Sequence, residues 1–148
     1  MTTSTYELLC EIAAAGCLVA ALIGAIAFRS GFAHPRAWIA IRVAQGMIIS
    51  VAAFGAVLMA GVGERGHGLQ YGYSLMAAAV SFAAEQLRLA SAQTVLAKIG
   101  VTDSAGVNGL PEEEQERLAR QIALRELGVE TVALLVCVAL LLRGANLY

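Results

Sequence analysis

Four consecutive residues, Glu85-Gln86-Leu87-Arg88, place a carboxylate, an amide and a guanidinium inside an apolar stretch that runs from about residue 71 to 97. A charge inside a membrane-spanning helix is costly, and it usually marks an interior contact or a functional site. Glu85 and Arg88 lie three residues apart and therefore share one helix face. Glu85 is a candidate proton carrier if no cation pairs with it.

Other polar residues are predicted at a similar depth on two further helices. At a rise of 1.5 Å per residue, Arg42 lies roughly 7 Å inside its segment, and Glu85 and Arg88 lie about 18 Å and 22 Å beyond Tyr73. Glu130 falls near the start of the last apolar segment. The predicted polar cluster therefore consists of Arg42, Gln45, Glu85, Gln86, Arg88 and Glu130.

This cluster has two interpretations. In the structural one, the arginines reach toward headgroups, the glutamates pair with them, and the set fixes the register of the helices. In the functional one, the cluster is a pocket for an ion, a polar headgroup or a substrate, with Glu85 as its key acid. Two arginines and two glutamates sum to zero charge, which favours the structural interpretation. The pairing, Arg42–Glu85 or Arg88–Glu130, is left open.

A second set of polar residues is predicted near the other membrane surface. Glu7 and Glu11 lie one turn apart near the start of the first segment, and Glu64, His67 and Tyr71 surround the second turn. Together they could line a cation entrance. Ordinary interfacial acids are the interpretation that the sequence favours.

The other reactive residues do not form a recognisable catalytic or metal site. His34 and His67 are predicted on opposite sides of the membrane, and no CxxC pair, nucleophile motif or phosphate loop occurs. Cys10 and Cys17 are about 10 Å apart along one helix and cannot bridge each other. With Cys137 they are expected to be buried thiols. We expect no metal and no cofactor, and an enzyme is disfavoured.

Composition indicates a membrane protein. The chain is 59% hydrophobic and 14% charged, whereas soluble domains are about a quarter charged. A length of 148 residues suits one domain with three or four spans of about 20 residues each. The net charge of −1 excludes a generally basic surface, so nucleic acid is not expected as a partner.

The predicted fold class is all-α, a polytopic membrane four-helix bundle in a single domain. Its spans are predicted at about 7–28, 37–63, 71–97 and 129–147. Residues 98–127 are predicted as a loop followed by an amphipathic helix, which begins near Pro111 with three acids in its first turn. Only Gly128 separates that helix from the last span, so their continuity is left open.

Small residues recur every four positions in two of the segments. Gly16, Ala20 and Gly24 form one stripe, and a second stripe follows in the next span at Ala52, Ala56 and Ala60. Such stripes allow close approach of a neighbouring helix within lipid.

The distribution of basic residues predicts the orientation. Positive residues concentrate on the cytoplasmic side of membrane proteins. The connections on one predicted side hold only Arg65 and Arg143. The connections on the other side hold Arg29, Arg36, Lys98, Arg117, Arg120 and Arg125. We therefore expect both termini outside and the 98–127 segment in the cytoplasm, in a bacterial inner membrane.

Three functional hypotheses follow. The first, which the sequence favours, is a homo-oligomeric or accessory subunit of a membrane complex, with the lipid bilayer and a second membrane protein or copy as partners. The second is a minimal oligomeric transporter or channel coupled to ions or protons. The third is a quinone- or haem-binding membrane protein, which the absence of a ligand set disfavours.

Overall fold

The computed structural model is all-helical in the residues that it describes, which are 2–61, 68–98, 100, 107 and 109–146. Its long helices are α1 (Thr2–Ser30), α2 (Pro35–Gly61), α3 (Gly68–Lys98) and α5 (Glu112–Ala145). The first three contain the predicted segments, apart from the end of the second, which lies outside the described residues. Most of the predicted loop before residue 110 also lies outside them.

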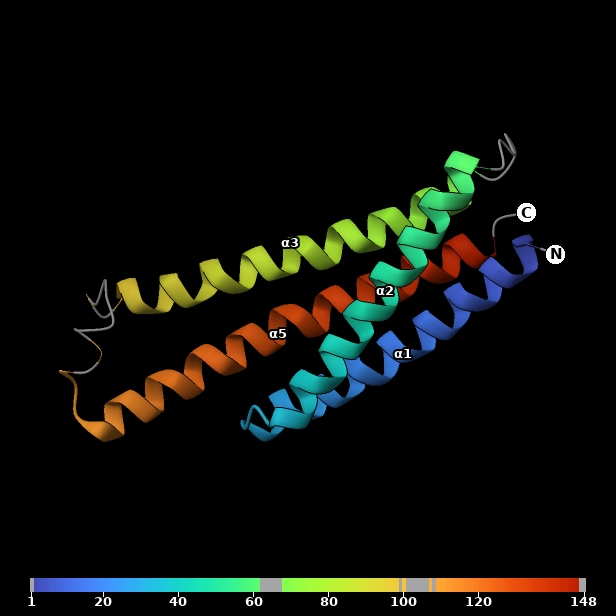
Figure 1. Ribbon diagram of the computed structural model, residues 1–148. Coiled ribbons are helices and arrows are strands. Elements are labelled where there is room, and N and C mark those ends of the chain that lie inside the picture. Colours follow the sequence, from blue (N-terminus) through green and yellow to red (C-terminus); the bar gives the residue numbers. More distant parts are fainter. Residues whose placement is uncertain (1, 62–67, 99, 101–106, 108, 147–148) are drawn as a thin grey trace.

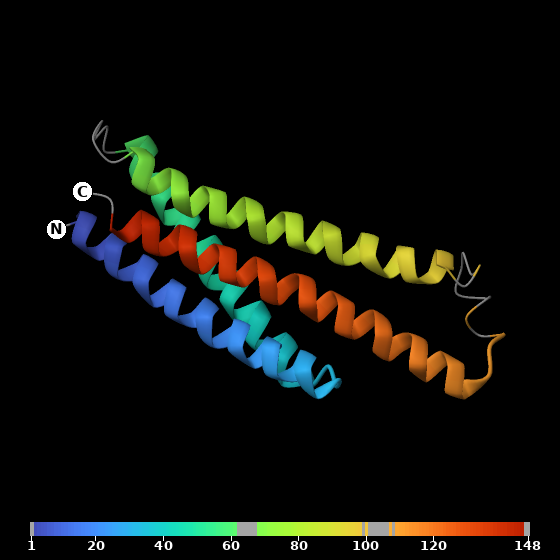
Figure 2. The same cartoon turned by 180° about the vertical axis from the view of Figure 1, so that it is seen from behind.

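The four helices alternate in direction and pack side by side (Figures 1 and 2). Helix α1 packs on α2 and α5, and α3 packs on α2 and α5 from the other side. The start of α1, the start of α3 and the end of α5 lie at the same end of the bundle. Tyr6 and Gly144 both approach the backbone carbonyl of Gln70 there.

Helix α5 joins two segments that the sequence left separable. Its 34 residues include the predicted amphipathic helix and the last span as far as Ala145. Pro111 immediately precedes the helix, and its carbonyl accepts bonds from the amides of Glu114 and Gln115. Gly128 does not interrupt the helix, and a Cβ there would lie 3.2 Å from the Phe28 ring. Its missing side chain therefore lets α1 approach closely.

Three helices, α1, α2 and α5, are long and apolar enough to cross a membrane. This agrees with the composition and is typical of a membrane protein. Helix α3, predicted as the third span, is not among the three. Its length suffices, but Glu85, Arg88 and several neutral polar residues lower its hydropathy.

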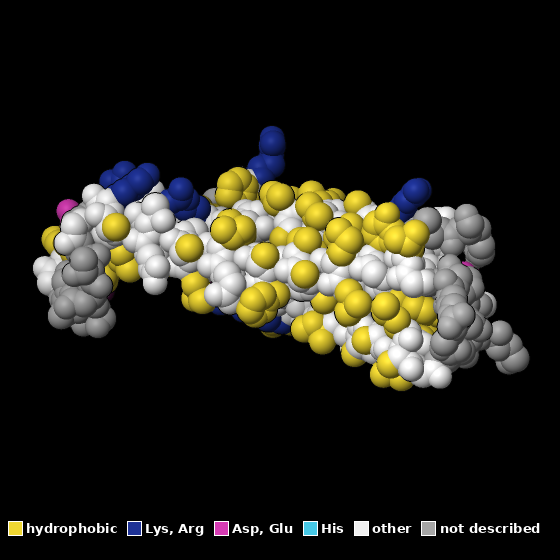
Figure 3. Space-filling view, turned by 90° about the horizontal axis from the view of Figure 1, so that it is seen from above, with side chains coloured by type: hydrophobic (Ala, Val, Ile, Leu, Met, Phe, Trp, Pro, Cys, Tyr) yellow, Lys and Arg dark blue, Asp and Glu magenta, His cyan; other side chains and the backbone are white. Residues whose placement is uncertain are grey.

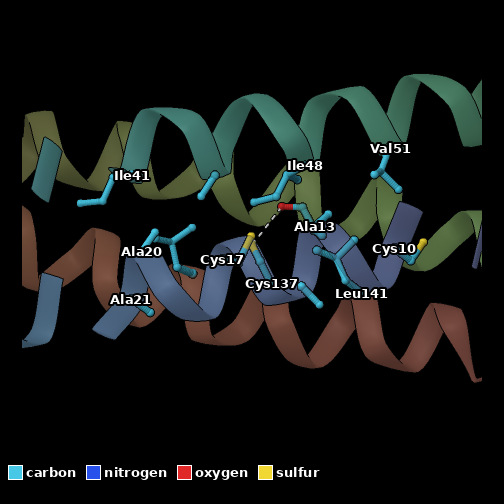
Figure 4. Close-up of a cluster of buried hydrophobic side chains, with 14 of the residues drawn as sticks. Cys10, Ala13, Cys17, Ala20, Ala21, Ile41, Ile48, Val51, Cys137 and Leu141 are labelled. Carbon is cyan, nitrogen blue, oxygen red and sulfur yellow. Dashed lines mark hydrogen bonds between the residues drawn. The ribbon is translucent and has the colours of Figure 1, made fainter. Parts of the chain in front are cut away.

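The core is built mainly from small and medium side chains on the facing sides of the helices (Figure 4). Cys10, Cys17 and Cys137 are all buried and free, as the sequence predicts. The dashed line in Figure 4 marks the bond from Cys137 Sγ to the Ala77 carbonyl, 3.3 Å long. These cysteines act as packing residues between α1, α3 and α5.

The first small-residue stripe serves the bundle itself. A Cβ on Gly16 would lie 2.8 Å from the sulfur of Met47 on α2, and one on Gly24 would overlap Thr131 on α5. Ala20 of the same stripe is buried. The stripe therefore allows close approach between helices of the same chain.

Helices α3 and α5 extend beyond the turn that joins α1 to α2 (Figures 1 and 2). Gly31 ends α1 with φ +70°, and the Phe32 amide donates to the Ala27 carbonyl across that turn. Arg120 Nε of α5 donates to the Gly31 carbonyl at 2.6 Å. We call the extension, formed by the end of α3 and the first part of α5, the α3–α5 arm.

An ionic network between three helices

Six side chains from three helices form one network near the base of the arm. Each helix contributes two of them, three or four residues apart and hence on one helix face. We call this set the ionic network. Its members are Arg42 and Gln45 on α2, Glu85 and Arg88 on α3, and Glu126 and Glu130 on α5.

Glu85 receives most of the positive charge in the network. Its Oε1 pairs with Arg42 and accepts a bond of 2.9 Å from Gln45 Nε2. Its Oε2 accepts from Arg88 Nε at 3.0 Å. Two guanidinium groups therefore neutralise this carboxylate, although its side chain is 23% exposed.

Gln45 occupies the centre and is only 6% exposed. Its Oε1 accepts a bond of 2.8 Å from Arg42 Nη1, and its Nε2 donates to both Glu85 and Glu130, the latter at 3.1 Å. One neutral amide thus joins all three helices. Because it uses its oxygen and its nitrogen at once, its orientation is fixed by the network.

Arg88 connects α3 to the other two helices. Besides Glu85, its Nη1 lies 3.6 Å from Oε2 of Glu126. Its guanidinium carbon lies 5.7 Å from the centre of the Trp38 ring on α2, a cation–π distance. Trp38 lies in the first turn of α2, so this contact joins α3 to the start of that helix.

Glu130 is the exception within the network. Its side chain is 1% exposed, and its Oε2 accepts the bond from Gln45. Within the described part of the chain, its Oε1 is the one buried side-chain oxygen or nitrogen without a hydrogen-bond partner. The salt bridges of the described residues include Glu85 and Glu126 but not Glu130.

The structure brings together five of the six residues predicted for the cluster and leaves out Gln86, which is exposed. The question of pairing is answered: Arg42 pairs with Glu85, and Arg88 pairs with Glu85 and Glu126 rather than with Glu130. The zero net charge inferred from the sequence therefore left out one acid of the network. Glu126 adds a third carboxylate to two guanidinium groups.

Sequence reasoning missed Glu126 because it lies before the predicted start of the last span. One signal was present: Glu126 and Glu130 are four residues apart, which puts both on one face if the helix continues through Gly128. Sequence reasoning also favoured Glu85 as the key acid. The structure gives Glu85 two cations and leaves Glu130 with none.

The second predicted set is only partly brought together. Glu7 Oε1 accepts a bond of 3.3 Å from Gln70 Nε2, while Glu11 is exposed. Tyr71 is buried, and its ring meets that of Tyr6 edge-on at 5.0 Å. Glu64 and His67 lie outside the described residues.

Tyr6 is a buried residue that the sequence did not single out. Its side chain is fully buried, and its hydroxyl donates to the Gln70 carbonyl at 3.4 Å. Gly55 makes room for it, since a Cβ there would lie 3.1 Å from the Tyr6 ring. This end of the bundle is therefore closed by an aromatic contact between α1, α2 and α3.

Among the described residues, no group of three or more His, Cys, Asp or Glu side chains could hold a metal ion. The ionic network can do two things chemically: hold three helices in one register, and carry a proton at its carboxyls. Comparisons with family models, curated proteins and solved structures give no match for this chain.

Proposed function

We propose that this chain is a polytopic membrane protein that works as a subunit of a larger assembly, formed with further copies or with another membrane protein. In this proposal all four helices cross a bacterial inner membrane. Both termini lie outside, and the α3–α5 arm extends into the cytoplasm.

The distribution of apolar side chains supports insertion. Large hydrophobic residues are exposed along all four helices, and they cover most of the length of the face shown in Figure 3. The largest group of basic side chains on that face lies toward the end where the arm extends. Such a surface would be unfavourable in water but suits lipid, with the basic end on the cytoplasmic side.

The ionic network supports the proposal that α3 crosses the membrane together with α1, α2 and α5. Residues 68–84 of α3 carry no charge, and the first two charges that follow are met by Arg42, Gln45 and Glu126 from neighbouring helices. Paired charges that face the bundle interior are the form in which ionisable residues are tolerated in membranes. The low hydropathy of α3 is therefore compatible with insertion as part of the bundle.

The arm is the observation that carries the proposal of a subunit. Helix α5 has 34 residues, a length of about 51 Å, whereas the hydrocarbon core is about 30 Å thick. The arm thus extends well past the lipid with little of its own core, mainly Val95 and Leu118. A two-helix extension of this kind offers surface to a partner.

A cleft at the base of the arm offers a place for contact. It lies between the α1–α2 turn and the first turns of α5 and has a volume of about 760 Å³. Phe32, 59% exposed, forms its apolar wall. Glu113, Glu116 and Arg117, which form no salt bridge with another described residue, provide charges of both signs. Aromatic residues and Arg are enriched at protein contact sites, and the rim around the apolar centre of such a site is polar.

The test is to purify the tagged chain from its membrane in mild detergent, measure its mass, and compare it with Phe32→Glu. The proposal expects a complex larger than the monomer, or a stoichiometric second protein, that is lost in Phe32→Glu. Phe82→Ala is the control, because Phe82 is another exposed aromatic, on α3, that does not line the cleft. A monomer without a partner, in native membranes as well as in detergent, would contradict the proposal.

A further inference from the structure

Glu130 stands in a different environment from the carboxylate nearest to it. Gln45 Nε2 donates to Glu85 at 2.9 Å and to Glu130 at 3.1 Å, so the two carboxyl groups share one amide. Arg42 and Arg88 both pair with Glu85. Glu130 has the amide alone, is 1% exposed, and keeps Oε1 without a partner among the described residues.

We propose that Glu130 is a buried proton-binding site, a carboxyl group that holds one proton inside the bundle while Glu85 beside it is ionised. The charge count of the network supports this assignment. Arg42 and Arg88 supply two positive charges, and Glu85, Glu126 and Glu130 supply three carboxyls. One proton makes the set neutral.

The contacts decide which of the three carboxyls holds that proton. Burying an ionised carboxylate without a cation costs far more than burying a neutral carboxyl with one unmade hydrogen bond. Glu85 and Glu126 each contact a guanidinium and can stay ionised. Two neighbouring carboxyls in unlike environments commonly divide into one ionised and one protonated group.

No other described group facing Glu130 replaces the missing cation. From α2 it contacts Gln45 and lies within electrostatic range of Arg42, whose guanidinium is bound to Glu85. From α3 it lies within electrostatic range of Glu85 and Arg88, which pair with each other. On its own helix the neighbouring titratable groups are the Glu126 carboxylate, which pairs with Arg88, and the Cys137 thiol, and neither is a cation. Helix α1 packs near this level of α5 through Gly24 and Phe28, which carry no titratable group.

Infrared spectroscopy of the reconstituted full chain can detect this proton directly. A protonated carboxyl has a carbonyl stretching band distinct from that of a carboxylate, and the band shifts in heavy water. The proposal expects such a band at neutral pH in the wild type, its loss in Glu130→Gln, and its persistence in Glu11→Gln, which removes an exposed acid outside the network. Absence of the band in the wild type, or its persistence in Glu130→Gln, would overturn the proposal.

A second measurement needs no variant to fold. With glutamate labelled at the side-chain carboxyl carbon, nuclear magnetic resonance of the wild type should show one carboxyl in the protonated state at neutral pH and the exposed acids ionised.

Thermal unfolding compares the stability of two variants. Glu130→Gln should keep the wild-type melting temperature, and Glu85→Gln should lower it. Equal losses in the two variants would mean that Glu130 is an ionised, paired group, and the proposal would fail.

Discussion

Replacing Gln45 with leucine tests whether one amide holds three helices together. The side chain makes three hydrogen bonds, to Arg42, Glu85 and Glu130, and is 6% exposed. Leucine has a similar volume and can make none of them. The substitution therefore removes the polar link between α2 and α5 and leaves both oxygens of Glu130 without a donor.

The three lost hydrogen bonds contribute unequally to the expected loss of stability in Gln45→Leu. Arg42 and Glu85 keep each other, and the Arg42 side chain is 50% exposed to other partners, so each of those two lost bonds should cost about 1 kcal/mol or less. Glu130 is fully buried and keeps nothing, which adds roughly 1–3 kcal/mol. We expect Gln45→Leu to lower the free energy of unfolding by about 2–4 kcal/mol.

Reversible unfolding in mixed micelles can measure this change. The chain has one tryptophan, Trp38, and it stacks on Arg88 of the network, so its fluorescence reports on this region while circular dichroism reports on the whole bundle. Gln86→Leu is the control, because Gln86 is the exposed amide on the neighbouring face of α3. It should change the free energy by less than about 0.5 kcal/mol.

A double substitution sharpens the test. Adding Glu130→Leu to Gln45→Leu removes the stranded carboxyl, and replacing both partners with apolar groups is often close to neutral. The double variant should therefore recover about 1–2 kcal/mol relative to the sum of the single variants. If Gln45→Leu is as stable as the wild type, or if the two substitutions simply add, the network does not hold the helices as described.

Three further predictions concern the packing of the bundle. Gly24→Ala should lower the free energy of unfolding by about 1–3 kcal/mol, because the added Cβ meets Thr131. Gly46→Ala is the control and should not lower it, because the space around Gly46 is open, and denaturant unfolding of the two variants measures the difference. Tyr6→Ala should cost about 3–5 kcal/mol, since it empties the fully buried aromatic contact with Tyr71, and a loss below 1 kcal/mol would contradict that packing. A maleimide should label no cysteine in the folded chain and three after denaturation, and rapid labelling of the native chain would show that the helices are packed differently from this arrangement. The residues concerned are Cys10, Cys17 and Cys137.

The positions of the helices could be predicted from the sequence almost completely. Apolar runs and the acids after Pro111 are local signals, and a helix forms from local signals. The burial of all three cysteines was also predictable, because an unpaired thiol in an apolar segment behaves as a small hydrophobe. The sequence left open whether the helix continues through Gly128, and in the structure it does, with the missing side chain of Gly128 making room for Phe28.

The partners of the charged residues could not be predicted to the same degree. Counting depth along each helix brought Arg42, Gln45, Glu85, Arg88 and Glu130 to one level, but depth does not determine rotation. Gln86 is adjacent to Glu85 in sequence and faces outward. Glu126 was missed because its place inside the network depends on α5 continuing past Gly128 and packing against α3.

The amino-acid sequence by itself determined that this protein is a set of long apolar helices with charges at one depth, because composition and periodicity depend only on neighbours along the chain. The tertiary structure alone decided which charges meet. Rotation of each helix about its axis, set by contacts such as Gly24 against Thr131 and Gly16 against Met47, gives Glu85 two guanidinium groups and Glu130 one shared amide. Contacts between segments far apart in the chain therefore separate an ionised acid from a buried acid that lacks a cation.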